Sequence, residues 1–145
     1  MTAAITVHDN VTAEAAHVDA GLGAFNDAAA PLHEVRALMC IAREQDGIVG
    51  GLVGRTWGNC AEIQQLWVDG AHRGRGVGSR LVRAFEARAL ERGCRAFYLE
   101  TFDFQAPGFY EKLGYRRVFA FDVYPHGIVR FTMLRDAGAN DPSPA

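Results

Sequence analysis

The stretch that decides the fold runs from residue 61 to residue 92 and reads AEIQQLWVDGAHRGRGVGSRLVRAFEARALER. Residues 61–68 predict a strand, and residues 77–92 predict a helix because apolar side chains recur along one stripe. That stripe is formed by Val77, Leu81, Phe85 and Ala89, and the charged residues fall mostly outside it, at Arg80, Arg83, Glu86 and Arg88. Gly93 then supplies the helix C-cap. A glycine-rich loop therefore joins a strand end to a helix start.

This loop, Arg73-Gly74-Arg75-Gly76-Val77-Gly78-Ser79, has the chemistry of an anion site. Glycines let backbone N–H groups converge, the helix start adds partial positive charge, and two arginines add phosphate-matched donors. The loop lacks the Gly-Lys-Ser/Thr of a Walker motif and the Gly-x-Gly-x-x-Gly spacing of a dinucleotide fingerprint. On local sequence alone, a plain strand-to-helix turn with solvated arginines stays an alternative.

Strands are expected on both sides of this unit. A meander of three antiparallel strands is predicted at 37–43, 48–57 and 61–68. The first two strands are joined by the turn Gln45-Asp46-Gly47, and the second and third by a turn at Gly58-Asn59. A strand–helix–strand crossover makes 95–101 parallel to 61–68. At Gln64-Gln65 the apolar alternation is disturbed, which predicts a bulge that parts the strand from its neighbour. After these strands we expect a helix at 107–113 that ends at Gly114. A final hairpin is expected from strands 115–123 and 128–134, with its turn at Pro125-His126-Gly127.

The N-terminal part adds a strand at 3–7 and a helix at 12–28, which Gly21 and Gly23 could bend and which Pro31 ends. The fold class is α/β (α+β): a mixed, mostly antiparallel sheet of about seven strands around one parallel pair, with helices on both faces. We expect one domain over 1–135 and a disordered polar tail over 136–145.

Composition narrows the class of protein. The chain has 145 residues and a net charge of −2, which favours one domain and gives no reason to expect nucleic acid as a partner. Its three cysteines lie in apolar stretches and predict free thiols. The first ten residues do not resemble a signal peptide, and no apolar run could span a bilayer, so a cytoplasmic protein without membrane contact is expected.

Two segments carry a resemblance to a known family. Leu66-Trp67-Val68-Asp69 with Arg73-Gly74-Arg75-Gly76-Val77-Gly78, and then Phe109-Tyr110-Glu111-Lys112-Leu113-Gly114-Tyr115, resemble motifs A and B of the GNAT superfamily of N-acetyltransferases. The resemblance extends over residues 5–134. It implies a sheet splayed open between 61–68 and 95–101, with acetyl-CoA in the opening and no metal. The implied coenzyme contacts are Leu66, Trp67, Val68, Arg73, Gly74, Arg75, Gly76, Val77, Gly78, Ser79, Gln105 and Tyr110, where Gln105 replaces the asparagine of many relatives.

The resemblance also suggests catalytic residues. Tyr110 is the expected general acid for the leaving thiolate, although tyrosine (pKa ~10) is a weaker acid than a thiol (~8.5). Glu62 corresponds to the base of histone-acetylating members. Both have structural alternatives: a tyrosine packed on the sheet and an exposed strand glutamate. Many relatives have no dedicated base, and His72 and His126 are further candidates. A backbone N–H near Val68 is the implied oxyanion donor.

The acceptor is expected to be a primary amine of a small molecule or peptide. Candidate acceptor contacts are Phe25, Asn26, His33, Trp57, Tyr124 and His126, which core or surface packing explains equally well. The main alternative is a catalytically weak acyl-CoA-binding sensor or interaction module; a nucleotide enzyme is a third class. A homodimer is an open option.

Overall fold

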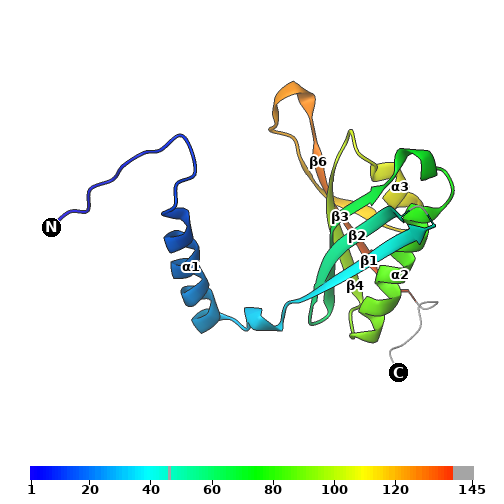
Figure 1. Ribbon diagram of the computed structural model, residues 1–145, viewed down its shortest axis with the longest axis horizontal. Coiled ribbons are helices and arrows are strands. Elements are labelled where there is room, and N and C mark those ends of the chain that lie inside the picture. The colour runs from blue at the N-terminus through cyan, green and yellow to red at the C-terminus, as the bar shows by residue number, and fades with distance from the viewer. Residues whose placement is uncertain (46, 139–145) are drawn as a thin grey trace. The chain divides into compact units, whose positions relative to one another are not determined.

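The structure is a computed structural model that describes residues 1–45 and 47–138 (Figure 1). The chain forms two units, residues 1–34 and a second unit that begins at Val35. The first unit holds α1 (Ala15–Ala29) and a 3-10 turn at Leu32–Glu34. The predicted helix is confirmed, and it runs unbroken through Gly21 and Gly23. The predicted strand at 3–7 is wrong, since these residues pair with no other strand.

The second unit contains a six-stranded sheet in the order β1-β2-β3-β4-β6-β5. The sheet is mixed and mostly antiparallel, as expected, and has six strands instead of about seven because residues 3–7 do not join it. Asp46 of the predicted first turn, and residues 139–145 of the predicted tail, lie outside the described residues. The strands are β1 (Arg36–Glu44), β2 (Gly47–Trp57), β3 (Cys60–Val68), β4 (Ala96–Phe102), β5 (Arg116–Phe121) and β6 (Arg130–Asp136).

The sheet parts between β3 and β4, its one parallel pair among the described strands. Their ladder begins at Cys60↔Ala96 and ends at Ile63↔Leu99, although β3 continues to Val68 and β4 to Phe102. The ends of both strands therefore diverge, as the sequence predicted. Because β3 remains paired with β2 on its other edge, its outer backbone groups beyond Ile63 face the gap.

A bulge on β3 coincides with the start of this gap. Val53 pairs with Gln65 and Gly54 with Ile63, so Gln64 is the extra residue, and the predicted bulge is confirmed. The extra residue shifts the alternation of side chains by one position. Ala61 and Ile63 before it, and Leu66 and Val68 after it, consequently all pack on the same core.

Two helices contribute to the core of the second unit, α2 (Val77–Glu91) and α3 (Pro107–Lys112) (Figure 1). Helix α2 packs against β1, β2 and β3, and the predicted stripe is confirmed by buried Leu81, Phe85 and Ala89. The core also contains Leu38, Leu52, Ala61, Ile63, Val82, Leu90, Cys94, Phe97, Leu99, Tyr110, Tyr115 and Met133. Helix α3 thereby brings Tyr110 to the same core as α2.

Glu86 corrects the expectation that the charged residues of α2 lie mostly outside its apolar stripe. It is 2% exposed, and its carboxylate accepts from three donors. Arg83 Nη1 donates to Oε1 at 2.7 Å, Tyr115 Oη donates to Oε2 at 2.7 Å and Arg135 Nε donates to Oε2 at 2.9 Å. Three charge-assisted hydrogen bonds offset the desolvation of this carboxylate, and they tie α2 to the end of α3 and to β6.

Candidate active site

The loop between β3 and α2 presents unpaired backbone donors. Gly74 (φ 76°) and Gly76 (φ 80°) both adopt the left-handed conformation that favours glycine. Gly76 is the N-cap of the fifteen-residue helix α2, and no side chain caps its first turn. The N–H groups of the first turn have no partner inside a helix, so they are free to bind an anion.

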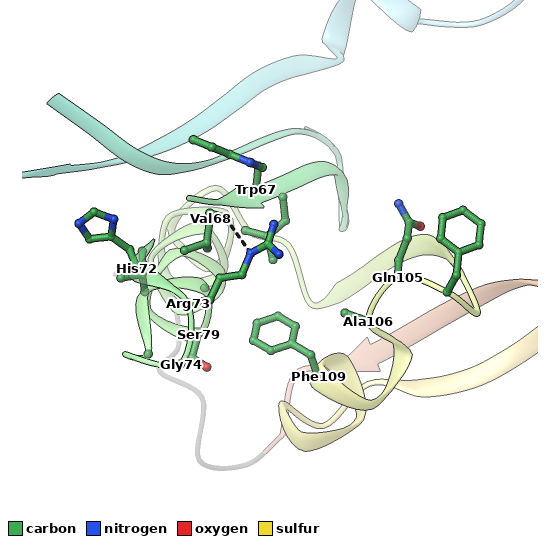
Figure 2. Close-up of a pocket in the computed structure, with 14 residues that line it drawn as sticks. Trp67, Val68, His72, Arg73, Gly74, Ser79, Gln105, Ala106 and Phe109 are labelled. Atoms are coloured by element: carbon green, nitrogen blue, oxygen red, sulfur yellow. Dashed lines mark hydrogen bonds between the residues drawn. The ribbon is translucent and has the colours of Figure 1, made fainter. Parts of the chain in front are cut away.

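Charged side chains surround these donors. Arg73 Nε donates to the Val68 carbonyl oxygen at 3.1 Å, which holds the guanidinium over the end of β3 (Figure 2). The His72 ring contacts two carboxylates, Asp69 Oδ2 at 2.9 Å from Nδ1 and Glu44 Oε2 at 3.0 Å from Nε2. The hydrogen bond with Asp69, followed by the hydrogen bond and charge of Glu44, raises the pKa of His72 against the opposing effect of burial. The loop thus combines backbone donors, an arginine and a histidine that favours its cationic form.

A cavity of about 710 Å³ lies beside this loop (Figure 2). Ten predicted coenzyme contacts line it: Leu66, Trp67, Val68, Arg73, Gly74, Gly76, Val77, Gly78, Ser79 and Gln105. Arg75 is exposed and does not line it. Four residues complete the lining that were not among the predicted contacts: His72, Phe104, Ala106 and Phe109. We call this the first cavity.

Phe109 explains why Gly78 has no side chain. A Cβ at Gly78 would lie 3.2 Å from Phe109 Cζ, so glycine lets the ring of α3 approach the first turn of α2. The Phe109 ring also packs edge-on against Tyr110, with centroids 5.1 Å apart. Phe109 therefore contacts both the first turn of α2 and Tyr110.

A second cavity, of about 420 Å³, opens where β3 and β4 part. Its lining is Ile63, Gln64, Gln65, Leu66, Trp67, Leu99, Glu100, Thr101, Gln105, Ala106, Phe109 and Tyr110. Five of these residues also line the first cavity: Leu66, Trp67, Gln105, Ala106 and Phe109. The two cavities are therefore neighbours, and together they lead from the glycine loop to the parted strands and Tyr110.

These features agree with what the chain is similar to. The model of the acetyltransferase (GNAT) family matches residues 6–115. The chain belongs to the GNAT acetyltransferase family. A blasticidin-S acetyltransferase from Streptomyces morookaense is 41% identical over 111 residues, which are 73% of this chain and 82% of that protein. An Agrobacterium fabrum acetyltransferase is 34% identical over 54% of this chain and 57% of its own length.

Solved GNAT structures have the same fold. An acetyltransferase from Bacillus cereus matches with a TM-score of 0.75 and 27% identity, over 91% of this chain and 97% of its own. A provisionally named streptothricin acetyltransferase from Bacillus anthracis, solved with acetyl coenzyme A, matches with a TM-score of 0.65 and 28% identity. That match covers 71% of this chain and 64% of the other. Acetyl-CoA is therefore the acyl donor of the family to which this chain belongs.

The residues of this GNAT chain fit that donor. Uncapped N–H groups and Arg73 suit a pyrophosphate, and the apolar side chains of the first cavity, such as Leu66, Val68 and Phe109, suit the pantetheine arm. Gln105 Oε1 accepts from the Phe102 N–H at 2.8 Å and from Thr101 Oγ1 at 3.3 Å. Because its oxygen is engaged by the chain, the amide NH₂ of Gln105 is the group left for a ligand.

Tyr110 is 8% exposed and lines the second cavity. Burial raises its pKa to about 12. The proton therefore stays on the hydroxyl at physiological pH, and Tyr110 is a weaker acid than a thiol of pKa ~8.5. A hydroxyl that keeps its proton can donate a hydrogen bond.

Glu62, the candidate base, lines neither cavity. Arg55 Nε donates to Glu62 Oε1 at 2.6 Å, and Glu62 also shares a hydrogen bond with Tyr98. Burial, followed by the charge and hydrogen bond of Glu62, raises the pKa of Tyr98 to about 12. The structure thus gives Glu62 two partners within the sheet and does not bring it to the cavity that Tyr110 lines.

The predicted acceptor contacts are distributed over both units. Phe25 and Asn26 lie on α1, and His33 lies in the 3-10 turn of the first unit. In the second unit, Trp57 ends β2 and His126 has a φ of 62° in the β5–β6 connection. Neither lines a cavity described above, and the same holds for Tyr124, whose ring packs against Phe102 and Phe121.

The sequence analysis missed one charged residue of the second cavity, Glu100 on β4. Its carboxylate pairs with Arg130 on β6, with 2.9 Å between Oε2 and Nε. The sequence marks Glu100 as the one charged residue of the run at 96–102, but it does not show that this residue lines a cavity. Among residues 1–45 and 47–138, no helix is long and apolar enough to cross a membrane.

Proposed function

We propose that this protein transfers an acetyl group from acetyl-CoA to a primary amine of a small molecule, by direct attack on the thioester in a ternary complex. The observation that carries the proposal is the pair of adjoining cavities. One begins at a phosphate-type loop, the other ends between parted strands beside Tyr110, and an acyl donor and its acceptor need such a continuous path.

Acetyl-CoA, when bound, supplies the activated acyl group. In this proposal the first turn of α2 and Arg73 hold the pyrophosphate, and Gln105 donates its amide to the pantetheine arm. The thioester then lies at the gap, where backbone N–H groups of β3 near Val68 face the carbonyl oxygen. Arg75, which is exposed and outside the cavity lining, is given no contact with the donor in this arrangement.

The reaction forms the C–N bond and breaks the C–S bond. The amine nitrogen attacks the thioester carbonyl, and the thiolate leaves with the electron pair of the C–S bond. Tyr110 donates a hydrogen bond to that sulfur and so stabilises the thiolate, consistent with a hydroxyl whose pKa is about 12. The proton of the amine goes to solvent, because Glu62 is engaged with Arg55 and lies outside the cavity lining.

The name of the Streptomyces morookaense relative, a blasticidin-S acetyltransferase, supports a small-molecule acceptor over a peptide. Blasticidin S is therefore the first acceptor to test, followed by aminoglycosides, polyamines, amino acids and short peptides. The cytoplasmic location and the homodimer expected from the sequence stay predictions.

The test is a thiol-release assay with acetyl-CoA and each acceptor, with the product identified by mass spectrometry. An N-acetylated small molecule supports the proposal. Acetylation of peptides alone would overturn the substrate class. Tight acetyl-CoA binding by calorimetry without thiol release from any acceptor would overturn the enzyme, and would favour the alternative of an acyl-CoA-binding module.

A further inference from the structure

The charges that line the two cavities are sharply divided. The first cavity has Arg73 and His72 and no acidic side chain among its lining residues. The second has one charged residue in its lining, the acid Glu100. A donor rich in phosphate suits the first set of charges. The single carboxylate of the second cavity suits a cation.

Glu100 already holds a cation in this structure. Arg130 Nε lies 2.9 Å from Glu100 Oε2, and the two side chains are 37% and 44% exposed, so the pair is open to exchange with solvent and solutes. The guanidinium also lies over two aromatic rings, with its central carbon 5.4 Å from the Phe121 centroid and 5.8 Å from that of Tyr124. A carboxylate beside electron-rich ring faces is an environment built for positive charge.

The aromatic group that surrounds Arg130 continues toward the first cavity. Tyr124 packs edge-on against Phe102 at 5.5 Å, and Phe102 stacks on Phe104 at 5.2 Å. Phe104 lines the first cavity, whereas Glu100 lines the second. Glu100 is thus linked to the aromatic group through Arg130 and lines the second cavity itself.

We propose that Glu100 is the residue that binds the acceptor, that the acceptor is a cationic amine, and that Arg130 competes with it for the carboxylate. This inference rests on the proposed function for its assignment of the second cavity to the acceptor. A primary amine is mostly an ammonium ion at pH 7, since amines of this type have pKa values of ~10. Entering the cavity removes its water, and Glu100 is the anion there that compensates. The bound ammonium loses one proton to solvent before the neutral nitrogen attacks the thioester.

The proposal predicts opposite effects from the two partners of one ion pair. Removing the Glu100 charge removes the site for the ammonium, so cation binding weakens. Removing the Arg130 charge frees the carboxylate and removes a like charge, so cation binding strengthens. An ion pair that served only to stabilise the sheet would shift both variants in the same direction.

The chain offers a matched control in Glu111 and Arg117. Their ion pair is also 2.9 Å long, their side chains are 46% and 43% exposed, and Arg117 lies over the Phe131 ring at 4.2 Å. Neither residue lines the cavities described above. Glu111→Gln and Arg117→Gln therefore remove a similar ion pair at another place on the same unit.

The experiment measures binding of benzylamine and of its uncharged analogue benzyl alcohol to the full chain saturated with CoA at pH 7, by NMR titration. We expect benzylamine to bind the wild-type chain at least tenfold more tightly than the alcohol. Glu100→Gln should remove that preference, Arg130→Gln should increase it two- to fivefold, and the Glu111 and Arg117 variants should retain the wild-type value. No preference in the wild-type chain, an unchanged preference in Glu100→Gln, or a loss in Arg130→Gln would each overturn the proposal.

Thiol release measured on the same protein preparations, with acetyl-CoA in place of CoA, separates this inference from the proposed function. Glu100-dependent binding of benzylamine without turnover of any acceptor would refute the enzyme and leave the cation site standing. Turnover with binding that does not depend on Glu100 would retain the enzyme and refute the cation site.

Discussion

The two cavities differ in what builds them. The glycine-loop end of the first cavity is made largely by backbone: two glycines in left-handed conformation, the uncapped start of α2 and a carbonyl that orients Arg73. The second is made by side chains from segments far apart in the chain, Gln64 on β3, Glu100 on β4 and Tyr110 on α3. A backbone site depends on a short local motif, whereas a side-chain site depends on how the sheet brings distant residues together.

The largest effect is expected from a substitution in the glycine loop, which alters the first cavity and leaves the second unchanged. We expect Gly76→Glu to weaken acetyl-CoA binding at least ~100-fold, since φ is +80° there and the new charge repels phosphate. Gly76→Ala, which adds strain without charge, should lose about tenfold. Calorimetry with acetyl-CoA measures both. Equal losses in the two variants would mean that charge at the loop plays no part.

Tyr110→Phe tests the second cavity and should leave the first intact. We expect kcat to fall ~100-fold because the thiolate loses its hydrogen bond, while the acetyl-CoA Kd changes less than about twofold. Steady-state kinetics and calorimetry on the same preparation give the two numbers. Wild-type turnover would exclude Tyr110 from the reaction, and a matching loss of affinity would assign it to binding.

His72 adds a titratable charge to the first cavity, whereas the charged residue of the second cavity is the acid Glu100. The pKa of His72 is raised by Asp69 and Glu44, so the cation is present below that pKa and is lost as the pH rises through it. Acetyl-CoA affinity of the wild-type chain should therefore fall with rising pH relative to His72→Gln, by about two- to fivefold for a partly screened charge. Parallel pH profiles of the two proteins would contradict this.

Glu62→Gln is expected to have the smallest effect. Because Glu62 is bound to Arg55 and lies outside both cavities, we expect a loss of turnover below about threefold that is uniform across pH. A large loss near neutral pH that recovers at high pH, where free amine is abundant, would instead identify Glu62 as the general base.

The sequence was most informative where structure depends on local interactions. The helix at α2, the turn at Gly58-Asn59 and the bulge at Gln64 each follow from neighbouring residues. Ten of the twelve predicted coenzyme contacts line the first cavity. The strand at 3–7 failed because a strand depends on a partner that its own residues do not specify.

Long-range pairs set the limit of prediction. Glu86 was expected outside the apolar stripe, but its partners Tyr115 and Arg135 are 29 and 49 residues away in sequence. Glu100 was missed for the same reason, since its place in a cavity depends on the separation of β4 from β3 and on Arg130. Local periodicity does not contain this information.

The buried Glu86 has a consequence for which acyl carriers the site can accept. Glu86 lies on α2, which begins directly after the glycine loop, and it accepts a hydrogen bond from Tyr115. The Tyr115 ring packs on Tyr110, with ring centroids 5.9 Å apart. The glycine loop and Tyr110 are therefore linked through contacts within one core. In the proposed reaction these contacts fix the distance between the loop that holds the pyrophosphate and the Tyr110 hydroxyl beside the sulfur. Acyl donors whose arm is too short to span that distance are rejected.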